Sequence, residues 1–133
     1  MTSTTVSRHT DSARRQSIRA DLVFWTAAGA VVAALSEPVA HWWQAPRAVL
    51  LDVGLTFAVL GPLLLLGLYR MRRVSRGLVA SFVVTNLLLA PLTAAAAWFD
   101  WLGLSAAGNW ALADAAAVML VLGVWQFAAV RRG

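Results

Sequence analysis

The sequence predicts an all-α fold: a four-transmembrane-helix bundle that follows a disordered N-terminal tail, with both chain ends in the cytoplasm. Three observations lead to this prediction: an apolar composition, four apolar stretches of bilayer-spanning length, and arginines gathered between particular stretches. Of the 133 residues, 60% are apolar and 13% are charged, and the mean hydropathy is +0.71. A water-soluble domain of this length could not bury so much apolar surface, so a bilayer is the expected surrounding.

Residues 1–20 form the predicted tail. They are rich in Ser, Thr and Arg and contain few apolar side chains, so they bury too little surface to offset the entropy of ordering. Residues 21–133 are expected to form one four-span membrane domain, because no polar linker interrupts their apolar stretches.

An alternative interpretation of the tail is an export signal. Arg14 and Arg15, four residues before Arg19, resemble a twin-arginine signal, and cleavage near Ala40 would leave three spans. The first apolar stretch is long for a signal sequence, and no clean cleavage site precedes a soluble domain. The favoured interpretation is that these arginines hold the tail in the cytoplasm.

Four apolar stretches are predicted to cross the bilayer, at 22–43, 48–69, 78–99 and 110–130. Each is close to the ~20 residues that span a hydrocarbon core. Helices are expected, because every backbone polar group inside a membrane must be paired within the segment. Proline lacks the backbone donor of a helix, so each span that contains one is expected to bend or open locally. These prolines are Pro38, Pro62 and Pro91.

Arginine placement predicts the orientation. Ten of the eleven arginines precede the first span, join the second span to the third, or end the chain, and only Arg47 lies on the other side. The positive-inside rule then places both termini in the cytoplasm. The absence of lysine and the abundance of alanine suggest a bacterial genome rich in G and C, so the expected location is a bacterial plasma membrane.

Composition also excludes several kinds of chemistry. The chain has no cysteine, which excludes disulfides, thiolate metal sites and cysteine nucleophiles. The net charge of +5 could indicate nucleic acid, but arginines beside apolar spans are better explained by topology and anionic lipid headgroups. No phosphate-binding glycine loop or zinc-protease motif is present. Catalysis is therefore unsupported, and neither a cofactor, a metal nor a nucleic-acid partner is expected.

Three carboxylates form the main candidate site. Counting along each predicted span puts Glu37, Asp52 and Asp114 at a similar depth, ~8–10 Å from the midpoint toward the outer face. His41 lies one turn beyond Glu37. Ionisable groups inside a membrane are costly and usually face a bundle interior or a water-filled cavity. This layer could therefore form an outward-opening vestibule for a proton, a cation or a cationic substrate.

Two other interpretations of the layer stay open. Asp52 and Asp114 lie near the outward N-termini of their helices, where the helix dipole favours negative charge, and Arg47 could pair with Glu37 or Asp52. Glu37, His41 and Asp114 could instead bind a metal, although two histidines and no cysteine in the chain argue against a dedicated zinc or haem site.

Two amide side chains are predicted to pack between helices. Asn86 lies near the middle of the third span and Gln126 near the inner end of the fourth. An amide in lipid is costly without a partner, so hydrogen bonds between helices, worth ~0.6–2 kcal/mol each, are the simplest account. Small residues at helical spacing, Gly54, Ala58 and Gly61, should mark a face of the second span that meets a neighbouring helix or a second copy.

Three segments carry a family resemblance. They are the loop Arg70-Met71-Arg72-Arg73, the stretch Val84-Thr85-Asn86-Leu87-Leu88, and the run Ala113-Asp114-Ala115-Ala116-Ala117-Val118 that leads to Gln126 and Arg131-Arg132. Through them, residues 46–132 resemble a family of small four-helix membrane proteins of bacteria, especially actinobacteria, whose function is uncharacterised. This chain has Leu89 and Asp114 where such proteins often have Trp and Gln. The resemblance implies a fold and a membrane location, and no activity.

The predicted function is that of a non-enzymatic membrane component or interaction subunit, associated with the bilayer and with a second copy or another membrane protein. An alternative is a small proton- or cation-coupled transporter that uses the carboxylate layer. Small multidrug transporters share the size, the four spans and a carboxylate in the first helix, but Glu37 lies near the outer end of its span. A third hypothesis is an accessory subunit of a membrane enzyme.

Overall fold

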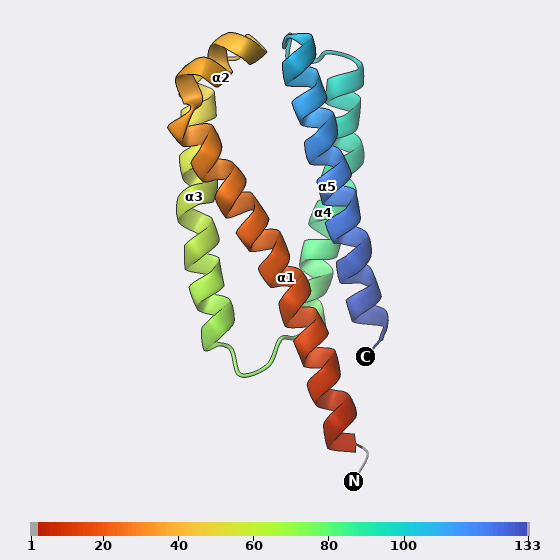
Figure 1. Cartoon of the computed structure of the whole chain (residues 1–133). Helices are drawn as coiled ribbons and strands as arrows, with labels where there is room; N and C mark the ends of the chain where they lie inside the picture. The colour runs from red at the N-terminus through yellow and green to blue at the C-terminus, as the bar shows by residue number, and fades with distance from the viewer. Residues whose placement is uncertain (1–2, 133) are drawn as a thin grey trace.

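A computed structural model describes the backbone of residues 3–132 and the side chains of residues 9–132. Within this range the chain forms helices and their connections (Figure 1). The helices are α1 (Ser3–Ala34), α2 (Ser36–Trp43), α3 (Arg47–Arg70), α4 (Arg76–Trp98) and α5 (Ala106–Arg131). By length and composition, His9–Ala34 of α1 and the whole of α3, α4 and α5 could each cross a membrane. The prediction of an all-helical chain with four helices of membrane-spanning character is confirmed.

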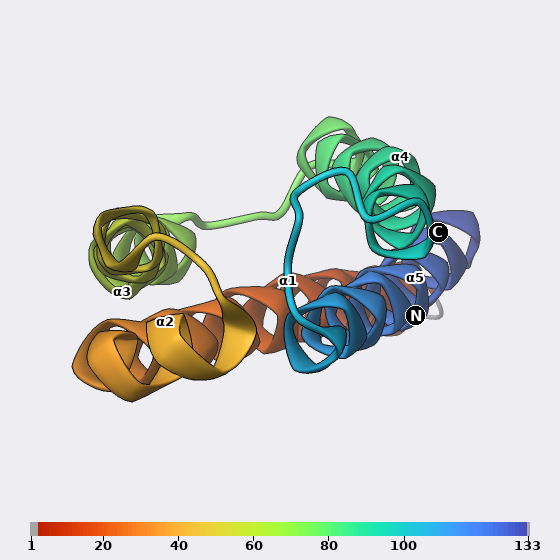
Figure 2. The ribbon, with the colours of Figure 1, turned by 90° about the horizontal axis from the view of Figure 1, so that it is seen from above.

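The four long helices are arranged as two pairs rather than as a symmetrical bundle. α1 packs along α3, and α4 packs along α5. Among the described residues the backbone of α3 lies close to neither that of α4 nor that of α5. α1 runs obliquely from α3 at one end of the molecule to α4 and α5 at the other, as Figures 1 and 2 show. α1 therefore joins the two pairs along their length, and the short α2 also contacts both α3 and α5.

Glycines allow α1 and α3 to pack with their backbones in contact. A Cβ added to Gly54 of α3 would lie 2.7 Å from the backbone nitrogen of Ala33 in α1, and a Cβ added to Gly29 would lie 2.7 Å from the Gly54 carbonyl oxygen. Gly61 is similarly pressed against Thr26. The small-residue face predicted on the second span thus meets a neighbouring helix of the same chain.

The predicted disordered tail differs from the structure. α1 begins at Ser3, while residues 1 and 2 lie outside the described part. The connection between α3 and α4 provides partners for the polar part of α1: the Asp11 Oδ1 atom accepts a hydrogen bond from the Val74 backbone, and the Arg15 guanidinium donates to the carbonyl of Met71. Ile18 is buried. Composition does not reveal these contacts, so the helical form of residues 9–20 was not foreseen from the sequence.

The first span also differs from its predicted bounds of 22–43. α1 ends at Ala34, and the short α2 follows after a break at Leu35. Pro38 explains the break, because its ring occupies the space of a helical bond to the Ala34 carbonyl and it has no N–H to donate. The other spans are close to prediction, with the largest difference at the start of α5, predicted at 110 and found at Ala106.

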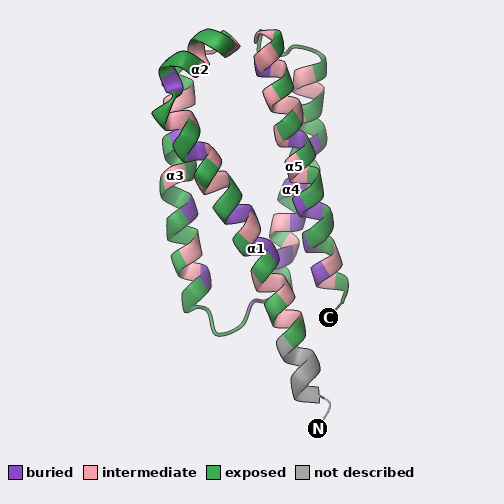
Figure 3. Ribbon diagram, viewed as in Figure 1, coloured by how far each residue is buried: buried purple, intermediate pink, exposed green. Residues whose placement is uncertain are grey.

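Buried residues lie in narrow lines where helices touch, and most of the helix surface is exposed (Figure 3). A buried apolar cluster joins the middle of α1 to the end of α3, to the α3–α4 connection and to the first part of α4. Its members are Ile18, Leu22, Leu68, Val74, Val79 and Val83. Exposed apolar side chains elsewhere are expected of a chain whose surrounding is hydrocarbon.

A methyl group at the backbone contact between α1 and α3 should destabilise the fold. We expect Gly54→Ala to lower the free energy of unfolding in detergent by ~1–3 kcal/mol, because overpacking forces two backbones apart. Gly67→Ala in the same helix is the matched control, because a Cβ there meets nothing within 4 Å. Equal stability of the two variants would show that α1 and α3 are not in backbone contact.

Candidate functional site

A buried polar cluster joins three helices at the point where α1 crosses α4 and α5. It consists of Asp21 from α1, Asn86 from α4 and Gln126 from α5, with exposed fractions of 3%, 6% and 0%. The Asp21 Oδ2 atom accepts hydrogen bonds from Asn86 Nδ2 at 2.7 Å and from Gln126 Nε2 at 2.6 Å. Asn86 Nδ2 also donates to Gln126 Oε1 at 3.0 Å. Each residue therefore bonds to both others.

Local packing brings the three side chains together. Gly123 lies one turn before Gln126 on α5, and a Cβ there would come within 2.8 Å of the Leu87 side chain and 3.3 Å of the Asn86 Cβ. α4 and α5 are thus close beside the cluster. On α1, Ser17 and Leu22 are buried on the face that carries Asp21. The cluster thus lies where α1 meets the α4–α5 pair.

The chemistry of the cluster follows from its donors and acceptors. A carboxylate only accepts hydrogen bonds, so the amide nitrogens of Asn86 and Gln126 must both face Asp21. Hydrogen bonds to a charged acceptor are stronger than those between neutral groups. A carboxyl can also take up or release a proton, and a protonated Asp21 would gain one O–H donor while it keeps some acceptor capacity. Protonation of the Oδ2 atom, which accepts both amide bonds, would rearrange the bonds that join the helices.

Sequence reasoning found two members of this cluster and missed the third. Asn86 and Gln126 were predicted to bond between helices, and the structure places them in contact with each other. Asp21 was overlooked because it lies two residues after Arg19, at the predicted start of the first span. A usable signal was its spacing of four residues from Ser17, which places both polar side chains on one helical face.

The carboxylates of the predicted outer layer lie elsewhere, on exposed surfaces. Glu37 of α2 is 3.7 Å from the Arg47 guanidinium, with 79% of its side chain exposed. His41, Asp52 and Asp114 are also exposed. Across the described residues, no three His, Asp or Glu side chains come together as a metal-binding group. The structure thus pairs Glu37 with Arg47, one of the interpretations left open above, and a functional role for the layer stays a prediction.

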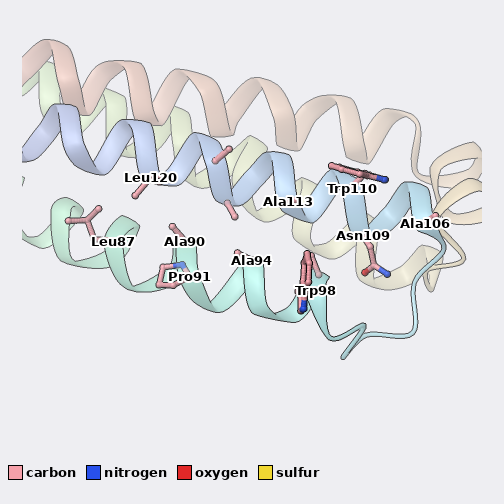
Figure 4. A pocket seen from close by; sticks show the side chains of 13 residues that line it. Leu87, Ala90, Pro91, Ala94, Trp98, Ala106, Asn109, Trp110, Ala113 and Leu120 are labelled. Carbon is pink, nitrogen blue, oxygen red and sulfur yellow. The ribbon is translucent and has the colours of Figure 1, made fainter.

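An apolar groove of about 850 Å³ runs along the seam between α4 and α5 (Figure 4). Small side chains form much of its wall, with Trp98 and Trp110 near one end and Asn109 as the polar lining residue. The alanines of the wall are Ala90, Ala94, Ala97, Ala106, Ala113, Ala116 and Ala117. Trp98 is 85% exposed and Trp110 is 72% exposed. Such rings are typical of the level at which hydrocarbon meets headgroups.

Comparison of the chain with models of protein families, with curated proteins and with solved structures gives no match. The resemblance of residues 46–132 to small bacterial membrane proteins stays a prediction.

Loss of one amide from the polar cluster should destabilise the chain. We expect Asn86→Val to lower the free energy of unfolding in detergent by ~1–3 kcal/mol, because it removes a donor from Asp21 and leaves the Gln126 oxygen unpaired. Thr85→Val, at the exposed neighbouring position, is the matched control. If the two valine variants unfold at the same denaturant concentration, the cluster contributes nothing to stability.

Proposed function

We propose that the chain is a non-enzymatic, multi-pass component of a bacterial plasma membrane that works as an interaction subunit. Four helices of membrane-spanning length support the location. Both ends of the described chain and the α3–α4 connection lie at one end of the molecule (Figure 1), and ten of the eleven arginines belong to these segments. Under the positive-inside rule, this end faces the cytoplasm.

The groove between α4 and α5 is the observation that carries the proposal. Small residues in membrane helices usually lie where another helix approaches closely. In the groove the exposed alanines Ala94 and Ala117 have no helix of the described chain over them. Fluid acyl chains can fill such a groove only by becoming ordered, whereas a folded helix is already ordered. A transmembrane helix is therefore the favoured occupant.

The occupant we propose is a helix beside the same groove of a second copy, in a two-fold dimer in which each copy covers the groove of the other. Copies inserted with the same orientation present their grooves at the same depth in the bilayer. A two-fold contact then places each α4–α5 face against its equivalent, which is the commonest arrangement of homo-oligomers. The large exposed rings of Trp98 and Trp110 on the rim of one copy would lie beside the small side chains of the other.

Cysteine crosslinking in membranes tests this dimer. The chain has no cysteine, so a single introduced thiol reports on one position. We expect Ala94→Cys to form a disulfide-linked dimer on oxidation, because the groove of one copy faces the groove of the next. Leu63→Cys is the control, at an exposed position of α3 outside the groove. Crosslinking of both variants to the same extent, or of neither, would contradict the proposed interface.

A second candidate function, proton-coupled transport, is favoured by one observation: the carboxyl of Asp21 is enclosed among three helices that belong to both pairs. An ionisable group in such a position commonly serves in proton movement. Protonation would alter the bonds between α1 and the α4–α5 pair, and so could couple a proton to helix motion.

Measurement of proton flux into liposomes shows whether Asp21 or the outer carboxylate layer carries such transport. If Asp21 carries protons, flux should fall to the level of protein-free liposomes in Asp21→Asn and persist in the triple variant Glu37→Gln, Asp52→Asn, Asp114→Asn. The opposite pattern would assign transport to the outer carboxylate layer. Absence of flux in the parent protein would count against proton transport and favour the interaction subunit.

A further inference from the structure

A second pocket, of about 480 Å³, lies at the end of the molecule that carries the α3–α4 connection. Four arginines line it, from segments far apart in the sequence. Arg14 and Arg15 come from α1, and Arg72 and Arg73 come from the connection after α3. The remaining lining residues are Thr10, Asp11, Ser12 and Val74. This set is called the arginine pocket below.

Specific contacts hold the two walls of the arginine pocket together. The Asp11 Oδ1 atom accepts a hydrogen bond from the Val74 backbone at 2.8 Å. The Arg15 guanidinium donates to the carbonyl oxygens of Leu68 and Met71, the latter at 2.9 Å. Val74 is buried against α1. The position of the connection, and with it that of Arg72 and Arg73, is thus fixed relative to α1.

The arginine pocket has a large excess of positive charge. Asp11 is its one acidic residue, and this carboxylate lies 3.6 Å from Arg15. For Arg14, Arg72 and Arg73, the structure of residues 9–132 shows no carboxylate within ion-pair distance. The Arg14 Nε atom is enclosed and has no hydrogen-bond partner there. Three guanidinium groups around one cavity therefore lack an anion to offset their mutual repulsion.

We propose that the arginine pocket binds the phosphate group of an anionic phospholipid at the cytoplasmic surface of the membrane. The planar guanidinium presents paired N–H donors that match the oxygens of a phosphate. Arg72 and Arg73 follow directly after the end of α3 at Arg70, which places the pocket at the level of the headgroups. Basic pockets at this level are typical binding sites for anionic headgroups. A free phosphate ion offers the same chemistry, and the experiment distinguishes the two sources.

The test compares two double variants that remove equal charge from the same end of the molecule (Figure 1). Arg72→Gln with Arg73→Gln removes both guanidinium groups from one wall of the pocket. Both side chains are exposed, so the helices should remain folded. Arg131→Gln with Arg132→Gln is the matched control outside the pocket. Binding of phosphatidylglycerol to the purified full chain is measured by native mass spectrometry, with phosphatidylcholine as the neutral lipid.

We expect affinity for phosphatidylglycerol to fall about tenfold or more in the pocket variant and to change little in the control, since nearby arginines contribute strongly to headgroup binding. Arg14→Gln, a third variant in the opposite wall, should weaken binding in the same direction. Equal loss in both double variants would overturn the proposal in favour of general surface charge. Displacement of the lipid by millimolar inorganic phosphate would overturn the assignment to a lipid headgroup.

Discussion

A polar side chain inside a bilayer has no water to bond, and the structure depends on how Asp21, Asn86 and Gln126 meet this requirement together. The carboxylate receives one donor from each amide, and the two amides bond to each other. Because lipid drives helices together only weakly, directional bonds of this kind have a large effect on which faces meet. They fix the point at which α1 crosses the α4–α5 pair. In the described chain α3 packs on α1 and α2, so its place in the molecule depends on that crossing and on the contact of α2 with α5.

The two contacts of α1 differ in physical character, and the difference shapes the exposed surface. Toward α3 the contact is close backbone packing at Gly29 and Gly54. Toward α4 and α5 it combines the buried polar cluster with the apolar cluster that joins Ile18 and Leu22 to α4. This asymmetric arrangement leaves the seam between α4 and α5 uncovered, and the groove results. At the arginine-rich end, the same helix holds the α3–α4 connection through Asp11 and Arg15. One helix thus organises the fold, the proposed interface and the proposed lipid site.

Much of the fold could be predicted because an apolar run must be long enough to cross the bilayer. The bounds of α3, α4 and α5 are close to those of the predicted runs. The N-terminal part of α1 could not, because its order depends on partners such as Val74 that lie far away in the sequence. The carboxylate layer was predicted by counting the depth of each residue along helices that were assumed to be continuous. That count ignores rotation about each helix axis and the break before α2, which together leave Glu37, Asp52 and Asp114 exposed. Asn86 and Gln126 could be identified as amides that need partners. Their contact with Asp21 could not be predicted, because it depends on how α1 crosses the α4–α5 pair.

The central claim is that the polar cluster holds α1, and through it α3, against the α4–α5 pair. The most direct measurement is the distance between spin labels at Leu63 of α3 and Val121 of α5, both exposed, by pulsed electron paramagnetic resonance in lipid nanodiscs. The account predicts one narrow distance distribution in the otherwise unaltered chain and a broad or displaced one after Asp21→Ala. An unchanged narrow distribution in that variant would contradict it.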